Sequence, residues 1–219
     1  MTSGALLSLF IVVPLLSAGL AAMLPWEFGR RALGFAVPIA GIGGSIVLLT
    51  QVAGANPGVL ADNVGAFPGG ISIPLVADSF SAIMLLTTAV VSLAAMWFAD
   101  IVGETRARFF PALALMLLGG AWGALLTADL FNLFVFIEVM LMPSFGLIAM
   151  TGTWARLSSA RMFIIVNLMT SLVLVTGVSL TYGVVGTTNL AALAGSAGPR
   201  GGIEFAEGVT GSQWQLVVA

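Results

Sequence analysis

Six long runs of apolar residues constrain this chain more than any other feature of its sequence. They cover roughly residues 4–24, 32–52, 77–99, 109–127, 130–150 and 162–186. About 20 apolar residues cross the hydrocarbon core of a bilayer as a helix. Each run is apolar on all faces, as is typical of lipid-embedded helices, whereas a transmembrane barrel would show short segments of alternating polarity. The sequence therefore predicts an all-α, polytopic membrane protein with a single transmembrane domain over residues 1–219.

The composition supports the membrane class and excludes several functions. Hydrophobic residues make up 59% of the chain and charged residues only 7%, too few to cover a soluble domain. The first run lacks a basic start and is too long for a signal peptide. Cysteine and histidine are absent and every basic residue is arginine, so we expect no cofactor, no metal site and no independent enzyme. The net charge of −2 argues against nucleic-acid binding.

The arginines predict the orientation. If the spans alternate, six of the seven arginines fall on one side, in the connections between the first and second, third and fourth, and fifth and sixth runs: Arg30, Arg31, Arg106, Arg108, Arg156 and Arg161. No predicted span contains an arginine. The positive-inside rule makes that side cytoplasmic and places the N-terminus outside a plasma membrane.

Two segments are expected on the outer side. Residues 53–76 are rich in glycine and proline and read as a loop, in which "ISIPLV" is a candidate extended piece. Residues 187–219 read as an outer loop carrying Glu204 and Glu207, followed by "QWQLVVA". We interpret these last residues as the start of a truncated seventh span of a longer protein; the alternative is a C-terminal tail.

The fifth run contains a glutamate, Glu138, in the stretch "ADLFNLFVFIEVMLMPSF". It lies nine residues after Asp129, which corresponds to a depth of about 13 Å, near the middle of the bilayer. An ionisable group there costs on the order of 3 kcal/mol and usually marks an ion or proton path. Burial disfavours the charged form, and the chain has no lysine to pair with it. The alternative is a protonated glutamate that only joins helices.

Other polar residues have weaker claims. Asp78 and Asp129 open the third and fifth runs and are expected to be N-caps. Asn167, Thr170 and Ser171 share one face of the sixth run, where they could extend a hydrated path from Glu138 or join helices.

Two further features of the spans concern helix geometry. Gly119 and Gly123 form a pair of small residues that favours close helix packing. Pro143 is either a kink beside Glu138 or an ordinary tolerated proline.

A family resemblance follows from three segments. "TADLFNLFVFIEVMLMPSFGLI" resembles the fifth-helix signature of the proton-translocating antiporter-like membrane subunits, which include the A and D subunits of Mrp-type Na⁺/H⁺ antiporters and large subunits of respiratory complex I. "VADSFSAIMLLTTAVVSLAAMWFAD" and "MFIIVNLMTSLVLVTGVSLTYGVVGTTNLAAL" are similar to the third helix and to the sixth helix with its following loop. The resemblance begins near residue 70 and is closest to the Mrp D subunit.

The resemblance implies the N-terminal part of an antiporter-like 14-helix fold. Glu138 then matches the fifth-helix glutamate that exchanges protons with a lysine on a broken seventh helix, a position beyond Ala219. The implied partners are other subunits, the lipid bilayer, protons and a monovalent cation such as Na⁺. Two alternatives remain open: a proton-pumping subunit of complex I (NADH:quinone oxidoreductase) or of a membrane-bound hydrogenase, and a scaffold subunit that transports nothing.

Overall fold

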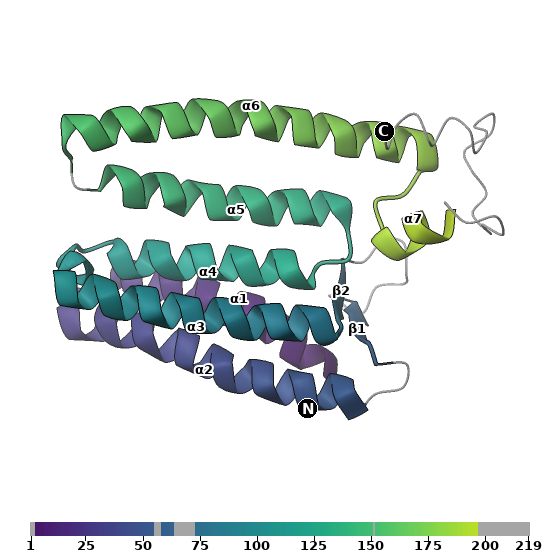
Figure 1. The fold of residues 1–219 in the computed structure, drawn as a ribbon, viewed down its shortest axis with the longest axis horizontal. Helices are drawn as coiled ribbons and strands as arrows, with labels where there is room; N and C mark the ends of the chain where they lie inside the picture. Colours follow the sequence, from purple (N-terminus) through teal and green to yellow (C-terminus); the bar gives the residue numbers. More distant parts are fainter. Residues whose placement is uncertain (1–2, 55–57, 64–72, 151, 197–219) are drawn as a thin grey trace.

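The helices of the chain run side by side in layers (Figure 1). The structure, a computed structural model, describes residues 3–54, 58–63, 73–150 and 152–196. Within these ranges the long helices are α1 (Ser3–Met23), α2 (Glu27–Gly54), α3 (Ser79–Val102), α4 (Phe110–Leu126), α5 (Leu130–Ala149) and α6 (Trp154–Val185). The short elements are β1 (Leu60–Asn63), β2 (Pro74–Ala77), the 3-10 helix η2 (Glu104–Arg106) and α7 (Leu190–Ser196). The predicted all-α membrane architecture is confirmed.

Five of the described helices are long and apolar enough to cross a membrane, whereas α4 has 17 residues. That length corresponds to about 25 Å, at the lower limit of a spanning helix. The expectation that the arginines lie in connections is wrong for four of them, because α2 and α6 begin earlier than hydropathy indicates. Arg30 and Arg31 lie in α2, and Arg156 and Arg161 lie in α6. Backbone hydrogen bonding extends a helix past the point where its side chains stop being apolar.

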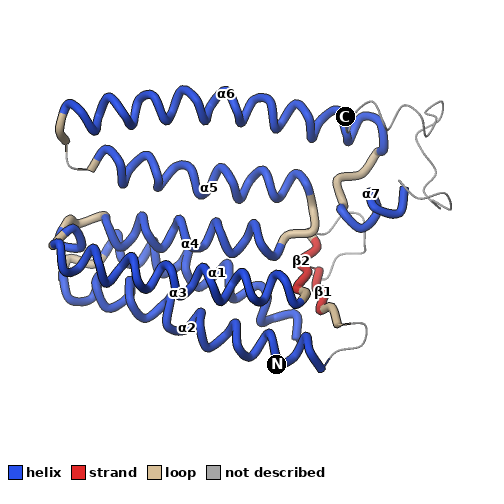
Figure 2. Tube along the Cα trace, viewed as in Figure 1, coloured by secondary structure: helices blue, strands red, loops and turns tan. Residues whose placement is uncertain are grey.

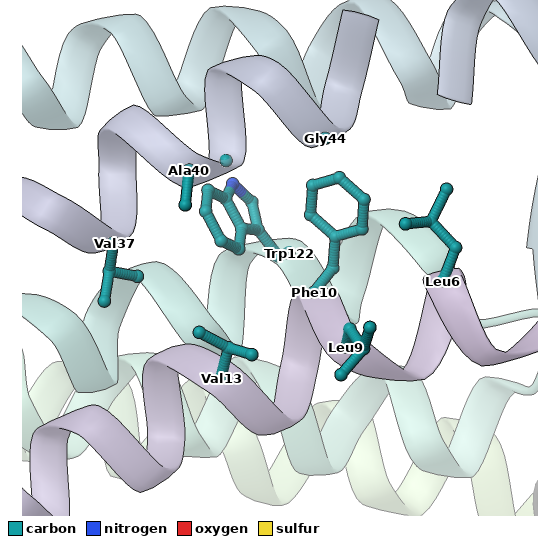
Figure 3. A pocket seen from close by; sticks show the side chains of 9 residues that line it. Leu6, Leu9, Phe10, Val13, Val37, Ala40, Gly44 and Trp122 are labelled. Carbon is teal, nitrogen blue, oxygen red and sulfur yellow. The ribbon is translucent and has the colours of Figure 1, made fainter. Parts of the chain in front are cut away.

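Helix α4 lies inside the layers, packed against α1 on one side and α5 on the other. Its Trp122 is almost fully buried and meets Phe10 of α1 edge to face, with ring centroids 5.3 Å apart (Figure 3). The indole Nε1 donates a hydrogen bond of 3.0 Å to Thr88 Oγ1 of α3. Gly41 of α2 leaves room for the ring, since a β-carbon there would overlap it. One tryptophan thus joins four helices.

The cavity in Figure 3 is not a candidate functional site. Its volume is about 200 Å³ and its lining is apolar, drawn from α1, α2 and Trp122. None of the residues that line it lies on α5 or α6.

The glycines of α4 face two different helices. A β-carbon on Gly119 would lie 3.0 Å from the Leu15 side chain of α1. Gly120 and Gly123 instead face α5, where a β-carbon on Gly120 would lie 2.6 Å from Met140 Cγ and one on Gly123 would overlap the Phe136 ring. Gly119 and Gly123 both allow close helix packing, as predicted, but against different helices, and the glycine that shares the α5 contact with Gly123 is Gly120.

A small β structure closes one end of the bundle (Figure 2). Strands β1 and β2 are antiparallel, with Leu60 opposite Ala77, and β2 begins within the "ISIPLV" segment. The three residues that connect α4 to α5, Thr127–Asp129, pair with this hairpin through Leu75 and with the chain after α6 through Asn189. Main-chain hydrogen bonds hold this connection on both sides, from Ala128 N to Pro74 O (3.0 Å) and from Leu190 N to Ala128 O (2.9 Å).

The segment after residue 186, expected as a loop, contains α7 (Leu190–Ser196). Arg200, Glu204, Glu207 and the predicted start of a seventh span at residues 213–219 lie outside the described residues.

The opposite end of the bundle holds the arginines of the described residues. The α1–α2, α3–α4 and α5–α6 connections all lie there (Figure 1). Arg31 Nη2 of α2 lies 2.5 Å from Asp100 Oδ1 of α3, and Arg156 Nη1 of α6 lies 4.0 Å from Glu104 Oε1 of η2. The end of α3 and the connection that follows it are therefore joined to α2 and α6 by ion pairs. We refer to this end as the arginine end.

Candidate functional site

Glu138 lies between two helices near the middle of α5. It is the ninth of the 20 residues of α5 and is half-buried. Helix α5 packs against α4 on one side and α6 on the other. From α6, the hydroxyl of Ser171 donates a hydrogen bond to Oε1 of Glu138. The carboxyl and the hydroxyl thus meet at the α5–α6 interface, in the middle of two apolar helices.

The surroundings of this pair offer no counter-charge within the described residues. The ion pairs among the described residues are Arg31–Asp100 and Arg156–Glu104, and both lie at the arginine end, away from Glu138. The described residues also contain no group of three or more His, Cys, Asp or Glu side chains able to hold a metal ion. A carboxyl can gain or lose a proton, and a serine hydroxyl beside it can donate a hydrogen bond to it or accept one from it.

The structure brings together only part of the predicted polar set on α6. Ser171 reaches Glu138, whereas Asn167 Nδ2 donates to Phe163 O (2.7 Å) and Thr170 Oγ1 donates to Val166 O (3.0 Å). Both of these acceptors belong to α6 itself. Asn167 and Thr170 therefore satisfy their own helix and make no described contact with the carboxyl.

Asp129 is the N-cap of α5 and also makes a long-range contact. Its Oδ1 accepts from the backbone N–H of Asn132 (2.8 Å), and its Oδ2 accepts from Thr188 Oγ1 (2.5 Å). Asn132 Nδ2 in turn donates to Thr127 Oγ1 (2.9 Å). Nothing in the sequence pattern singled out Thr188, which is 59 residues away and follows α6. Asp129 therefore ties the start of the glutamate-bearing helix to the end of its neighbour.

Asp78 is the N-cap of α3. Its Oδ1 accepts from the backbone N–H of Ser81 at 2.7 Å, and this hydrogen bond holds the pKa of the Asp78 carboxyl below its ordinary value.

Helix α5 continues through Pro143, which is buried, as far as Ala149.

Replacing Asp129 with alanine is expected to lower the stability of the purified protein. The loss of the cap costs about 1 kcal/mol, and the loss of a hydrogen bond to a carboxylate costs about 1.5–3 kcal/mol. Thermal unfolding in detergent micelles measures the change as a fall in Tm. Thr188→Val removes only the hydrogen bond from Thr188 to Asp129, so its Tm should fall less than that of Asp129→Ala. Asp129→Asn keeps an acceptor for the N-cap hydrogen bond. If Asp129→Ala has the same Tm as the wild type, neither the N-cap hydrogen bond nor the Thr188 contact contributes to stability.

Comparison with known proteins places the chain among membrane subunits. Residues 127–217 match the family described as NADH:quinone oxidoreductase/Mrp antiporter, TM. The chain is 39% identical over 168 residues to the D subunit of a probable K⁺/H⁺ antiporter of Rhizobium meliloti, covering 75% of this chain and 31% of the relative. It is 36% identical over 191 residues to the D subunit of a Na⁺/H⁺ antiporter of Bacillus subtilis, covering 84% of this chain and 37% of the relative.

Solved structures give the same picture. A chain of the Mrp complex from Dietzia sp. DQ12-45-1b superimposes with a TM-score of 0.84 and 41% identity, over 90% of this chain and 38% of that one. A chain of respiratory complex I from Thermus thermophilus gives a TM-score of 0.65 at 26% identity, over 84% of this chain and 38% of that one. The chain spans less than two fifths of the length of each of these four relatives.

Proposed function

Because the chain belongs to the family of NADH:quinone oxidoreductase/Mrp antiporter membrane subunits, we propose that it is part of the D subunit of a multi-subunit monovalent cation/proton antiporter. The observation that supports this most strongly is Glu138, a carboxyl in the middle of an apolar helix whose only described polar side-chain partner is the hydroxyl of Ser171. An ionisable group at that depth is costly and is typical of an ion or proton path.

In the proposed mechanism, Glu138 takes up and releases a proton in the middle of the membrane. In general, an apolar environment favours the neutral form of a carboxyl, and the approach of a cation or of water favours the charged form. The described residues provide no cation next to Glu138. In this proposal the cation comes from the remainder of the subunit or from another subunit. Movement of that cation relative to Glu138 then couples proton uptake and release to transport.

The proposal includes an orientation and an exchanged ion. The arginine end faces the cytoplasm and the N-terminus lies outside the plasma membrane, in accordance with the positive-inside rule. The relatives named above are described as K⁺/H⁺ and Na⁺/H⁺ antiporter subunits, so the ion is a monovalent cation. The other subunits of the antiporter are the protein partners.

A second candidate is the corresponding subunit of a redox-driven proton pump. The likeness to a chain of respiratory complex I favours it, at a TM-score of 0.65. The carboxyl of Glu138 would carry protons in the same way in an antiporter and in a redox-driven pump. The two differ in what drives the proton, either a cation gradient or electron transfer.

The test uses vesicles that contain the complete assembly, with a pH-sensitive dye inside. We expect addition of Na⁺ or K⁺ to move protons without any electron donor, and Glu138→Gln to abolish this movement while the assembly stays intact. Proton movement that requires an electron donor would favour the redox pump. Unchanged movement in Glu138→Gln would contradict a transport role for this carboxyl and favour a scaffold.

A further inference from the structure

Most hydroxyls of α6 share one arrangement, from which Ser171 departs. Five of the six other serines and threonines of this helix donate to the carbonyl one turn earlier: Ser159, Thr170, Thr176, Ser179 and Thr181. This is the ordinary arrangement for a hydroxyl in an apolar helix, because it satisfies the donor locally. The hydroxyl of Ser171 is instead directed across the interface to the carboxyl of Glu138.

The position of Ser171 supports a specific role for this contact. Most of α6 is exposed, and its less exposed side chains form a stripe towards α5 that includes Asn167, Ser171 and Val178. Ser171 is the residue of this stripe whose side chain is hydrogen-bonded to α5. The Asp129–Thr188 contact and the main-chain bond from Leu130 N to Thr188 O (2.9 Å) hold the two helices in register at the hairpin end.

We propose that Ser171 is a positioning residue for Glu138: its hydroxyl orients the carboxyl and sets the pH range over which Glu138 exchanges protons. This inference rests on the proposed function and deepens it. A serine hydroxyl donates one hydrogen bond and accepts others. It therefore donates to the ionised carboxylate and accepts from the protonated carboxyl, so Glu138 keeps a partner in both states.

No other described group competes for this role. Helices α1 and α4 carry no charged or titratable side chain, and Glu138 is the only one within α5. On α6 these groups are Arg156, Arg161 and Tyr182. Each is at least ten residues from Ser171 along the helix, a separation of about 15 Å or more.

The expected effect of Ser171→Ala is a shift in the pH profile of proton movement. The ionised carboxylate loses a donor, so the proton stays bound to a higher pH and the profile moves upwards. The shift should be about one pH unit, as for the loss of one hydrogen bond to a charged group. Ser171→Thr keeps the hydroxyl and should restore the wild-type profile. Ser179→Ala makes the same chemical change two turns away, on a hydroxyl that bonds its own helix, and should leave the profile unchanged.

An infrared measurement separates this inference from the proposed function. The carboxyl band of Glu138 in the complete assembly is identified by its absence in Glu138→Gln, and we expect Ser171→Ala to shift it as a hydrogen bond is lost. Wild-type values of both the band and the pH profile in Ser171→Ala would overturn the role of Ser171 and leave the antiporter proposal standing. Unchanged transport in Glu138→Gln would overturn the proposed function, and the band would still report on the contact. If Ser171→Ala does not assemble, Ser171→Cys carries the same test, because a thiol is close in size and a weaker donor.

Discussion

Glu138→Gln is expected to reduce cation-dependent proton movement by about 100-fold or more, the scale on which removal of a proton-transfer group acts. Glutamine has nearly the shape of glutamate and its carbonyl still accepts from Ser171, so the α5–α6 interface stays intact. It cannot bind or release a proton at physiological pH. The measurement is the initial rate of internal pH change after addition of Na⁺ or K⁺ to vesicles, divided by the amount of assembled complex.

Two matched variants make this result specific. Glu138→Asp keeps a carboxyl but withdraws it from Ser171 by one methylene, so we expect an intermediate loss. Glu104→Gln makes the same chemical change at the arginine end, where Glu104 lies 4.0 Å from Arg156, and should preserve transport. Equal losses in Glu104→Gln and Glu138→Gln would indicate that any missing carboxylate weakens the assembly and would remove the special status of Glu138.

Gly120→Leu is expected to prevent α4 and α5 from packing. A β-carbon on Gly120 would lie 3.1 Å from the backbone nitrogen of Met140 and 3.2 Å from the backbone oxygen of Phe136, so the main chain of α5 itself must move. Overpacking of this kind costs about 3 kcal/mol or more when side chains alone cannot absorb it. The yield of monodisperse protein on size-exclusion chromatography and its Tm should both fall strongly.

Gly43→Leu is the matched control for this substitution. Gly43 lies inside α2 and a β-carbon there would meet no atom within 4 Å. The same change of residue should therefore leave yield and Tm close to the wild type. If yield and Tm fall equally in both variants, the fall comes from replacing any glycine in a membrane helix and not from the α4–α5 contact.

Much of this arrangement follows from hydropathy and chain geometry. Apolar runs of about 20 residues can hardly become anything but membrane helices, because every backbone polar group must be satisfied inside the segment. The placement of Glu138 near the middle of α5 rests on the same counting. The helix ends were less predictable, since α6 begins at Trp154 rather than at residue 162. Hydropathy marks where a helix becomes apolar and carries no information about where its backbone hydrogen bonds begin.

The contacts between helices could not be predicted from hydropathy and residue spacing. A face shared by Asn167, Thr170 and Ser171 does not indicate which of the three meets α5, because that depends on how α6 is rotated about its axis. Gly119 and Gly120 are adjacent in sequence yet face α1 and α5. Thr188 meets Asp129 only because the chain after α6 returns to the start of α5. Each of these facts is a property of tertiary packing.

The connection Thr127–Asp129 has a mechanical consequence. It is held by main-chain hydrogen bonds to the β2 strand on one edge and to the return from α6 on the other. Among the described residues, the far end of α6 has the Arg156–Glu104 pair at 4.0 Å and the ring contact of Phe163 with Phe145, both made by side chains alone. We therefore expect any separation of α6 from α5 to pivot at the Thr127–Asp129 connection and to be widest at the arginine end.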